Sequence, residues 1–191
     1  MADTPLLKLP IDEFLNRLAS DAPVPGGGSV GALAGALAAA LGRMVCALTA
    51  GKPKFADVQS QIEQIAARLT RAELMLKRLI DEDAAAYGEL HAAFKLEKSD
   101  PNRKRHIAAA AELAAAVPLE TVAVSRQVLG DLRRLEQIGN PNLRSDVEAG
   151  VHMARAAMNA AAANVRVNLS LLPEEKSGGV AAALARLTAE E

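Results

Sequence analysis

A stripe of apolar side chains between residues 55 and 97 constrains the fold of this chain more than any other feature. Its members are three and then four residues apart without a break, which is typical of helices packed along a common seam. They are Ile62, Ile65, Leu69, Ala72, Leu76, Leu79, Asp83, Ala86 and Leu90. No segment alternates between apolar and polar residues as a half-buried strand would. The pattern predicts an all-α bundle of long antiparallel helices.

The apolar residues of the chain are mostly small. Half of the residues are hydrophobic, but only 2% are aromatic. A core of alanine and glycine requires close helix backbones, and Gly31 and Gly35 lie one turn apart in the segment 29–50. This segment is predicted to be a buried central helix. Its charge-free part ends before Arg43. That part is too short to span a membrane, so no membrane contact is expected.

Start and stop signals divide the rest of the chain into further helices. Helices are expected over about residues 10–19, 29–50 and 55–97, and the next one from Pro101 to Val117. Pro118 is expected to kink or break this helix before a further one ends near residue 138. The residues from Ser145 to Glu148 resemble a capping box that opens the last major helix, and residues 177–191 are expected to form a short one. No linker divides the chain, so residues 1–191 are predicted to form one domain.

Charge and cysteine content limit the partners and the compartment. The 22 basic and 23 acidic side chains nearly cancel, so the chain has no overall basic field for nucleic acid. The N-terminus shows no secretory signal, and the single Cys46 fits a reducing compartment. These features predict a cytoplasmic protein. The three histidines show no ligand spacing, so no metal site is expected.

Asp83 is the one carboxylate on the apolar stripe. A buried carboxylate costs free energy unless it is hydrogen-bonded, paired or used in chemistry. It either bridges helices as a satisfied acid or faces a cleft between them. Tyr87, one turn further on, lies over the same face and could add a flat wall and a hydroxyl.

Three consecutive glycines, Gly26 to Gly28, precede the segment rich in small residues. They match a dinucleotide-binding pattern together with Gly31, but no strand precedes them, so a nucleotide fold is not favoured. A glycine-rich turn that enters a helix presents free N–H groups to an anion or a carbonyl. The alternative is a tight turn that needs glycine for its backbone angles.

Other polar groups are weaker candidates. Asp146 lies in the first turn of the last major helix, where Asp is common, but the preceding loop carries Asn140, Asn142 and Arg144. Lys52 and Lys54 follow a helix end, where lysine is ordinary. Asn164 and Asn168 lie one turn apart and could fix the helix register instead of binding a ligand.

Six of these segments, in this order, resemble the cyclodeaminase/methenyl-tetrahydrofolate cyclohydrolase family. They are residues 23–29, 48–55, 81–87, 116–119, 139–146 and 164–168. The resemblance implies an all-helical homodimer without a metal or a cofactor beyond its tetrahydrofolate substrate. Such an enzyme hydrolyses 5,10-methenyltetrahydrofolate to 10-formyltetrahydrofolate, or releases ammonia from 5-formiminotetrahydrofolate. Since the chain shows no formiminotransferase domain, cyclohydrolase is the first expectation and cyclodeaminase the second.

The resemblance also implies roles for the candidate residues. Asp83 is expected to be the general base and Asp146 a second catalytic carboxylate. Lys52 and Arg144 are expected to meet the glutamate carboxylates of a substrate that can be polyglutamylated. The other expected substrate-binding residues are Pro25, Gly26, Gly27, Gly28, Ser29, Tyr87, Asn140, Asn164 and Asn168. A non-enzymatic, dimeric assembly module remains the competing interpretation of the alanine-rich faces.

Overall fold

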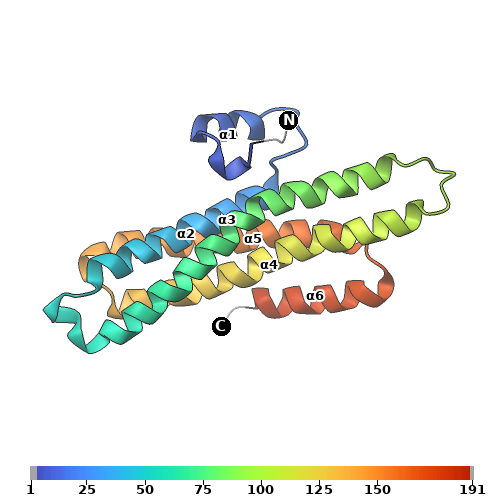
Figure 1. Cartoon of the computed structure of the whole chain (residues 1–191). Helices are drawn as coiled ribbons and strands as arrows, with labels where there is room; N and C mark the ends of the chain where they lie inside the picture. Colours follow the sequence, from blue (N-terminus) through green and yellow to red (C-terminus); the bar gives the residue numbers. More distant parts are fainter. Residues whose placement is uncertain (1–3, 190–191) are drawn as a thin grey trace.

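The protein is a bundle of long helices, seen in a computed structural model that describes residues 4–189. The described residues contain helices and no strand, which confirms the all-α prediction (Figure 1). The α-helices are α1 (Ile11–Leu18), α2 (Gly27–Thr49), α3 (Gln59–Lys95), α4 (Arg103–Ile138), α5 (Arg144–Leu169) and α6 (Glu174–Thr188). Short 3-10 helices cover Leu6–Lys8, Pro53–Val58 and Pro141–Leu143.

Four of the helices surround a common core. Helix α2 packs against α3 and α5, and α4 packs against the same two helices from the other side. Helix α6 lies along α4 and α5 (Figure 1). Every apolar member of the predicted stripe on α3 is buried, so the seam interpretation is confirmed. The stripe is what brings α3 against both of its neighbours.

Small residues let α2 lie close to the other helices. A Cβ placed on Gly35 would lie 2.8 Å from Ser125 Oγ of α4, and one on Gly31 would lie 3.3 Å from the Ala161 nitrogen of α5. The opposite face of α2 is not covered by this chain, because Leu37, Met44 and Leu48 are exposed. Helices α2 and α4 are long and apolar enough to cross a membrane by length and composition, and half of each apolar window is buried in the bundle.

Several predicted helix ends were wrong. Helix α4 begins at Arg103 rather than Pro101, because Asp100 accepts a hydrogen bond from the Asn102 amide in a preceding turn. It then continues through Pro118 to Ile138 as one helix instead of two.

The other corrections concern short segments. Residues 55–58, expected within the long third helix, belong instead to the 3-10 helix Pro53–Val58, and α6 starts at Glu174, directly after Pro173. The predicted capping box is absent, because α5 already begins at Arg144 and no side chain caps it. The turn at Pro141–Leu143 leads directly into α5, which places Ser145 inside the helix.

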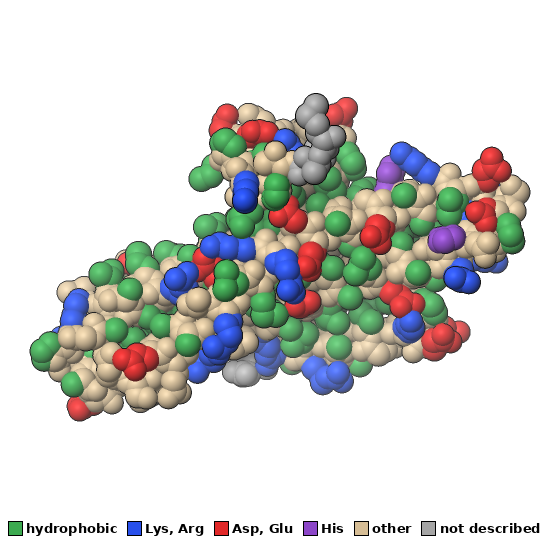
Figure 2. All heavy atoms as spheres, in the orientation of Figure 1, with side chains coloured by type: hydrophobic (Ala, Val, Ile, Leu, Met, Phe, Trp, Pro, Cys, Tyr) green, Lys and Arg blue, Asp and Glu red, His purple; other side chains and the backbone are tan. Residues whose placement is uncertain are grey.

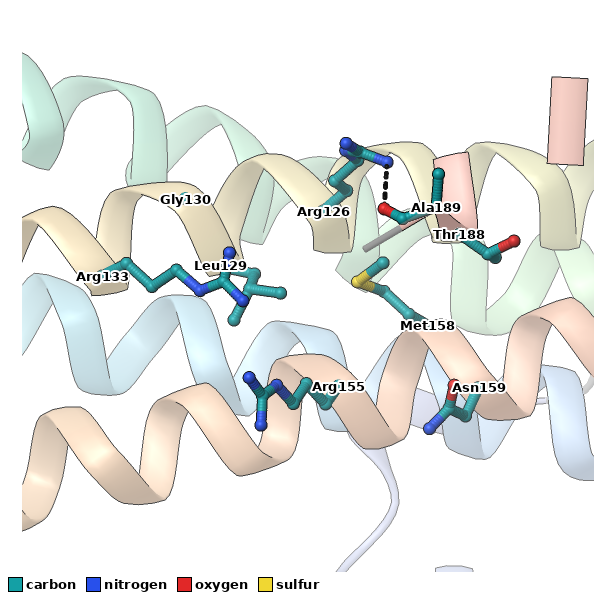
Figure 3. A pocket seen from close by; sticks show the side chains of 9 residues that line it. All are labelled: Arg126, Leu129, Gly130, Arg133, Arg155, Met158, Asn159, Thr188 and Ala189. Atoms are coloured by element: carbon teal, nitrogen blue, oxygen red, sulfur yellow. Dashed lines mark hydrogen bonds between the residues drawn. The ribbon is translucent and has the colours of Figure 1, made fainter. Parts of the chain in front are cut away.

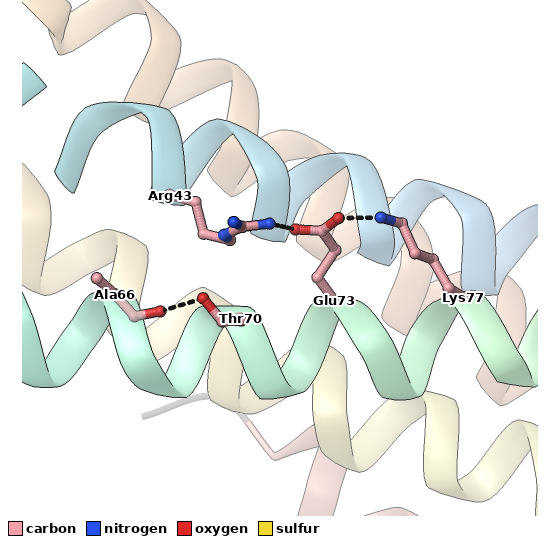
Figure 4. A network of polar contacts seen from close by, with 5 residues as sticks. All are labelled: Arg43, Ala66, Thr70, Glu73 and Lys77. Carbon is pink, nitrogen blue, oxygen red and sulfur yellow. Dashed lines mark hydrogen bonds and ion pairs between the residues drawn. The ribbon is translucent and has the colours of Figure 1, made fainter. Parts of the chain in front are cut away.

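A buried acid joins α2 to α3. Glu73 is only 6% exposed, and its carboxylate accepts hydrogen bonds from Arg43 of α2 and from Lys77 one turn along α3 (Figure 4). Burial raises the pKa of Glu73, but the hydrogen bonds and charges of Lys77 and Arg43 together bring the pKa below its usual value. The ionised form of Glu73 therefore stabilises the fold.

We expect Glu73→Gln to lower the free energy of unfolding at neutral pH by about 1 kcal/mol, because both cations are partly exposed and can turn to water. Since the pKa of Glu73 is depressed in the folded state, its contribution is present above 4.5, the ordinary value, and is lost as the pH falls through the folded value. Denaturant titrations between neutral and acidic pH should therefore show a smaller acid loss in the variant. Glu63→Gln, an exposed site on the same helix, is the control and should match the wild type.

Candidate active site

A cavity of about 190 Å³ lies at the beginning of α2. Helix α2 starts at Gly27, while α3 and α5 continue past this point and α4 runs alongside them (Figure 1). The cavity is bordered by the first turn of α2 and by residues of α3, α4 and α5. The loop before α2 closes one side. The lining residues are Pro23, Val24, Gly26, Gly27, Gly28, Asp83, Tyr87, Leu90, Ala114, Asn164 and Asn168.

Asp83 projects from α3 onto the first turn of α2. The Ser29 hydroxyl shares its proton between Asp83 Oδ2 and the Ile80 carbonyl oxygen, each at 3.0 Å. The Ser29 backbone amide also donates to the carboxylate. Since Gly26 has no side chain to cap α2, Asp83 does so from a neighbouring helix. The carboxylate therefore lies at the positive end of the α2 dipole.

The triple glycine is what allows this approach. A Cβ placed on Gly28 would lie 1.9 Å from Asp83 Oδ1 and 2.5 Å from its Cγ, so only glycine fits here while Asp83 keeps this position. No lysine or arginine pairs with Asp83 among the described residues, and the carboxylate lines the cavity. Of the two alternatives left open by the sequence, Asp83 therefore faces a cleft while it also bridges two helices.

The surroundings shift the acidity of Asp83. Burial raises its pKa above the ordinary value of 3.8, and the Ser29 hydrogen bonds oppose that rise. A carboxylate whose pKa moves toward neutrality is a stronger proton acceptor once it is ionised. The cavity thus contains one acid with the electrostatics of a general base.

Two asparagines from α5 form the opposite wall. Asn164 Nδ2 donates to the Ala160 carbonyl at 2.9 Å and lies next to Gly27. Asn168 Nδ2 donates to the Ala114 carbonyl of α4 at 2.8 Å and to the Asn164 carbonyl at 3.1 Å. Both protons of the Asn168 amide are therefore used within the protein, and its Oδ1 remains as an acceptor.

An aromatic pair borders the cavity on α3. The Tyr87 ring lines the cavity and is 44% exposed. His91, one turn further along, stacks on it with the ring centroids 6.0 Å apart and the planes 12° from parallel. This pair gives the rim of the cavity a flat face.

The structure brings together only part of the predicted site. Gly26, Gly27, Gly28, Asp83 and Tyr87 line the cavity with both asparagines. Pro25 and Ser29 are buried directly behind this lining. Sequence reasoning missed the lining by Pro23, Val24, Leu90 and Ala114. Leu90 carried a signal as the last member of the apolar stripe, whereas Ala114 carried none.

The remaining predicted residues lie at the far end of the bundle. Asp146 and Arg144 are in the first turn of α5, whereas Asn164 and Asn168 are near the opposite end of that helix. Asn140 lies in the loop before α5, where its backbone amide donates to Thr49 Oγ1 and its side chain accepts from the Asn142 amide. Lys52 follows the C-terminal end of α2. Within one chain these four predicted residues, Lys52, Asn140, Arg144 and Asp146, do not reach the Asp83 cavity.

A second cavity of about 390 Å³ lies between α4, α5 and the end of α6. Its wall carries Arg126, Arg133 and Arg155 (Figure 3). Arg126 donates to the carbonyl oxygens of Arg186, Leu187 and Ala189, which holds the end of α6 against α4. Its described lining includes no carboxylate, histidine or thiol, so it offers no base at neutral pH. Of these two cavities, the smaller one is therefore the candidate active site.

Basic and acidic side chains are intermixed along α3 and α4 on the face shown in Figure 2. Among the described residues, no three histidine, cysteine or acidic side chains gather where they could hold a metal ion.

Comparison with known proteins identifies the family. The family model of formiminotransferase-cyclodeaminase matches residues 10–188. A methenyltetrahydrofolate cyclohydrolase of Methylorubrum extorquens is 37% identical over 83% of this chain and 78% of its own length. A formimidoyltransferase-cyclodeaminase of Gallus gallus is 33% identical over 91% of this chain, which spans only 33% of that longer protein.

A solved structure agrees with the family model and with these two relatives. The crystal structure of formiminotetrahydrofolate cyclodeaminase from Thermotoga maritima is 29% identical to this chain. It superposes with a TM-score of 0.87 over 94% of this chain and 88% of the other. The chain therefore belongs to the formiminotransferase-cyclodeaminase family.

Proposed function

We propose that this chain is a folate one-carbon enzyme that hydrolyses 5,10-methenyltetrahydrofolate to 10-formyltetrahydrofolate in the Asp83 cavity. The observation that carries the proposal is a carboxylate with a raised pKa, held against a glycine-rich helix start in an open cavity. The cyclohydrolase of Methylorubrum extorquens, which this chain matches over most of its length, supports the choice of reaction.

The chemistry suits a single base. The methenyl bridge is an amidinium cation shared by two nitrogens, and the ionised Asp83 stabilises that charge. Water attacks the bridge carbon while Asp83 accepts one of its protons. Asp83 then returns this proton to N5 as the bond between the carbon and N5 breaks. The hydroxyl proton of the tetrahedral adduct is released to water as the C=O bond forms, which leaves the formyl group on N10. A positioned base of this kind contributes about 10²–10⁴ in rate.

The other lining groups bind and orient the substrate. The backbone amides of Gly27 and Gly28 lie in the first turn of α2, where no intrahelical acceptor exists, and can donate to a carbonyl or an anion. Asn168 Oδ1 accepts from a ring or amino N–H group. The exposed ring of Tyr87 provides a surface for stacking against a heterocycle.

The residues at the far end of the bundle can meet an Asp83 cavity only if that cavity belongs to a second copy of the chain. We propose a homodimer that packs the uncovered α2 faces, with Leu37, Met44 and Leu48, against each other. In an antiparallel pair, the end carrying Lys52, Asn140, Arg144 and Asp146 in one copy lies beside the Asp83 end of the other. Asp146 would then serve as the second carboxylate, and Lys52 and Arg144 would meet the glutamate carboxylates of the substrate.

Mixed variants test this arrangement. Asp83→Asn and Asp146→Asn should each be inactive alone, and a one-to-one mixture that exchanges subunits should recover about a quarter of the wild-type activity. Half of the dimers are then mixed, and each holds one intact site of two. A mixture that recovers no activity, or sedimentation of the wild type as a monomer, would show that the two ends do not form one site across a dimer.

Cyclodeaminase activity is the second candidate, because the Thermotoga maritima structure and the Gallus gallus relative carry that name. Ring closure of the formimino group with loss of ammonia needs the same carboxylate beside the same carbon. Purified protein should be given the methenyl and formimino substrates separately, with absorbance and released ammonia followed. Loss of methenyl absorbance without ammonia production from the formimino compound supports the hydrolase.

Thermal-shift titration separates both enzymes from an assembly module. A folate at about 100 times its Kd should stabilise the protein by about 2.7 kcal/mol. A module without a folate site would show no shift.

A further inference from the structure

Pro118 lies in the middle of α4, where proline is costly. The residue is buried, and α4 continues through it to Ile138. Because proline has no backbone N–H, it cannot donate to the carbonyl four residues earlier, that of Ala114. A helix interior thus contains a carbonyl that has lost its regular donor, and such groups are normally satisfied by another partner.

The partner comes from α5. Asn168 Nδ2 donates to the Ala114 carbonyl at 2.8 Å and uses its second proton on the Asn164 carbonyl at 3.1 Å. Two carbonyl contacts fix which end of the amide carries the nitrogen, so Oδ1 is the end left to accept. Ala114, Asn164 and Asn168 all line the Asp83 cavity. The Asn168 side chain therefore links the carbonyl that Pro118 leaves without a donor to the cavity.

We propose that Pro118 is a positioning residue: by freeing the Ala114 carbonyl, it anchors the Asn168 amide and presents Asn168 Oδ1 to the cavity as a fixed hydrogen-bond acceptor. The acceptor selects a ligand that offers an N–H group, such as a ring lactam or an amino substituent, over one that offers a carbonyl. This inference rests on the proposed function for its choice of ligand, but the link between Pro118 and Asn168 does not.

Pro118→Ala is the direct test. Alanine restores an N–H that competes for the Ala114 carbonyl and releases Asn168, while it favours the helix. We expect KM to rise about 3- to 10-fold, the value of one hydrogen bond, with a smaller change in kcat. Asn168→Ala should raise KM by a similar factor. The double variant should be no worse than Asn168→Ala, because both changes remove the same interaction.

The thermal midpoint separates positioning from packing. Pro118→Ala should keep or raise the midpoint while it weakens binding. Val117→Ala is the matched control, because it removes buried carbon from the adjacent residue without adding an N–H group. It should lower the midpoint and leave KM unchanged. If Pro118→Ala lowers the midpoint and leaves KM unchanged, Pro118 has only a packing role.

A readout independent of activity distinguishes this inference from the proposed function. In the wild type, the side-chain amide protons of Asn168 should exchange slowly with solvent in NMR spectra, because both are hydrogen-bonded. In Pro118→Ala they should exchange faster. Retained protection would overturn the positioning role even in an active enzyme. A wild type that shows this protection but neither binds nor converts a folate would overturn the proposed function alone.

Discussion

Asp83→Asn should reduce turnover of the methenyl substrate by about 10²–10⁴-fold, because an amide neither accepts the proton from water nor balances the amidinium charge. The shape of the site should change little, since asparagine still accepts from the Ser29 hydroxyl through Oδ1. Loss of methenyl absorbance, measured at saturating substrate, checks this directly. If Asp83→Asn keeps near-normal turnover, Asp83 is only a structural cap for α2.

The same substitution should raise stability at neutral pH. The pKa of Asp83 is raised in the folded state, so its protonated form is the one that the fold favours. That contribution is fully present below 3.8, the ordinary value, and is lost as the pH rises through the folded value. Above it, the ionised carboxylate costs stability that a neutral amide does not. A higher melting temperature together with a lost activity identifies a group kept for chemistry.

The pH profile gives a further check on Asp83. Because the base must be ionised, kcat/KM should fall as the pH drops through its raised pKa, and the residual rate of Asp83→Asn should lack this limb. Asp81→Asn is the matched control on the same helix. Asp81 accepts from the Leu6 amide at 2.6 Å and does not line the cavity, so its variant should keep the wild-type profile.

Gly28→Ala should have the second large effect, a loss of at least about 100-fold in kcat/KM. The new Cβ would overlap the Asp83 carboxylate, which must turn away from the first turn of α2 and lose its hydrogen bonds with Ser29. Displacement of a catalytic group by about 1 Å is enough for a loss of this size. Steady-state kinetics and a circular-dichroism melt together show whether the loss is in the site or in the fold.

Gly26→Ala is the matched control for Gly28→Ala. No described atom lies within 4 Å of a Cβ placed on Gly26, and its backbone is extended, so alanine fits there without displacement. This variant should keep the wild-type kcat. Equal losses in both variants would mean that the glycine-rich turn needs flexibility rather than space beside Asp83.

The sequence was most informative where one residue breaks a regular pattern. Asp83 stood out because a carboxylate replaced an apolar residue on the seam of α3, and its position there follows from helical geometry alone. The triple glycine stood out in the same way, but its reason, the space needed by Asp83, is a tertiary contact that no local pattern contains.

Sequence reasoning was weakest where a distant partner decides the structure. Pro118 predicted a kink or a break in α4, but Asn168 of α5 compensates for the missing donor and the helix continues without a break. Asp146 was grouped with Asp83 by resemblance, and a linear motif does not specify that the two lie at opposite ends of one chain. In the proposed homodimer, its place in a site depends on the second copy of the chain rather than on the local sequence.

The cap that Asp83 places on α2 also fixes how far α2 and α3 are shifted along each other. The connection between these helices, residues 50–58, lies at the other end of the bundle, so its length can change without moving the contact with Ser29. One residue inserted within α3 ahead of Asp83 is different, because it would turn the acid by about 100° around the helix axis. Insertions and deletions among relatives should therefore occur only in the connecting segment. The number of residues from Ile62, the first apolar residue of the seam, to Asp83 should stay constant.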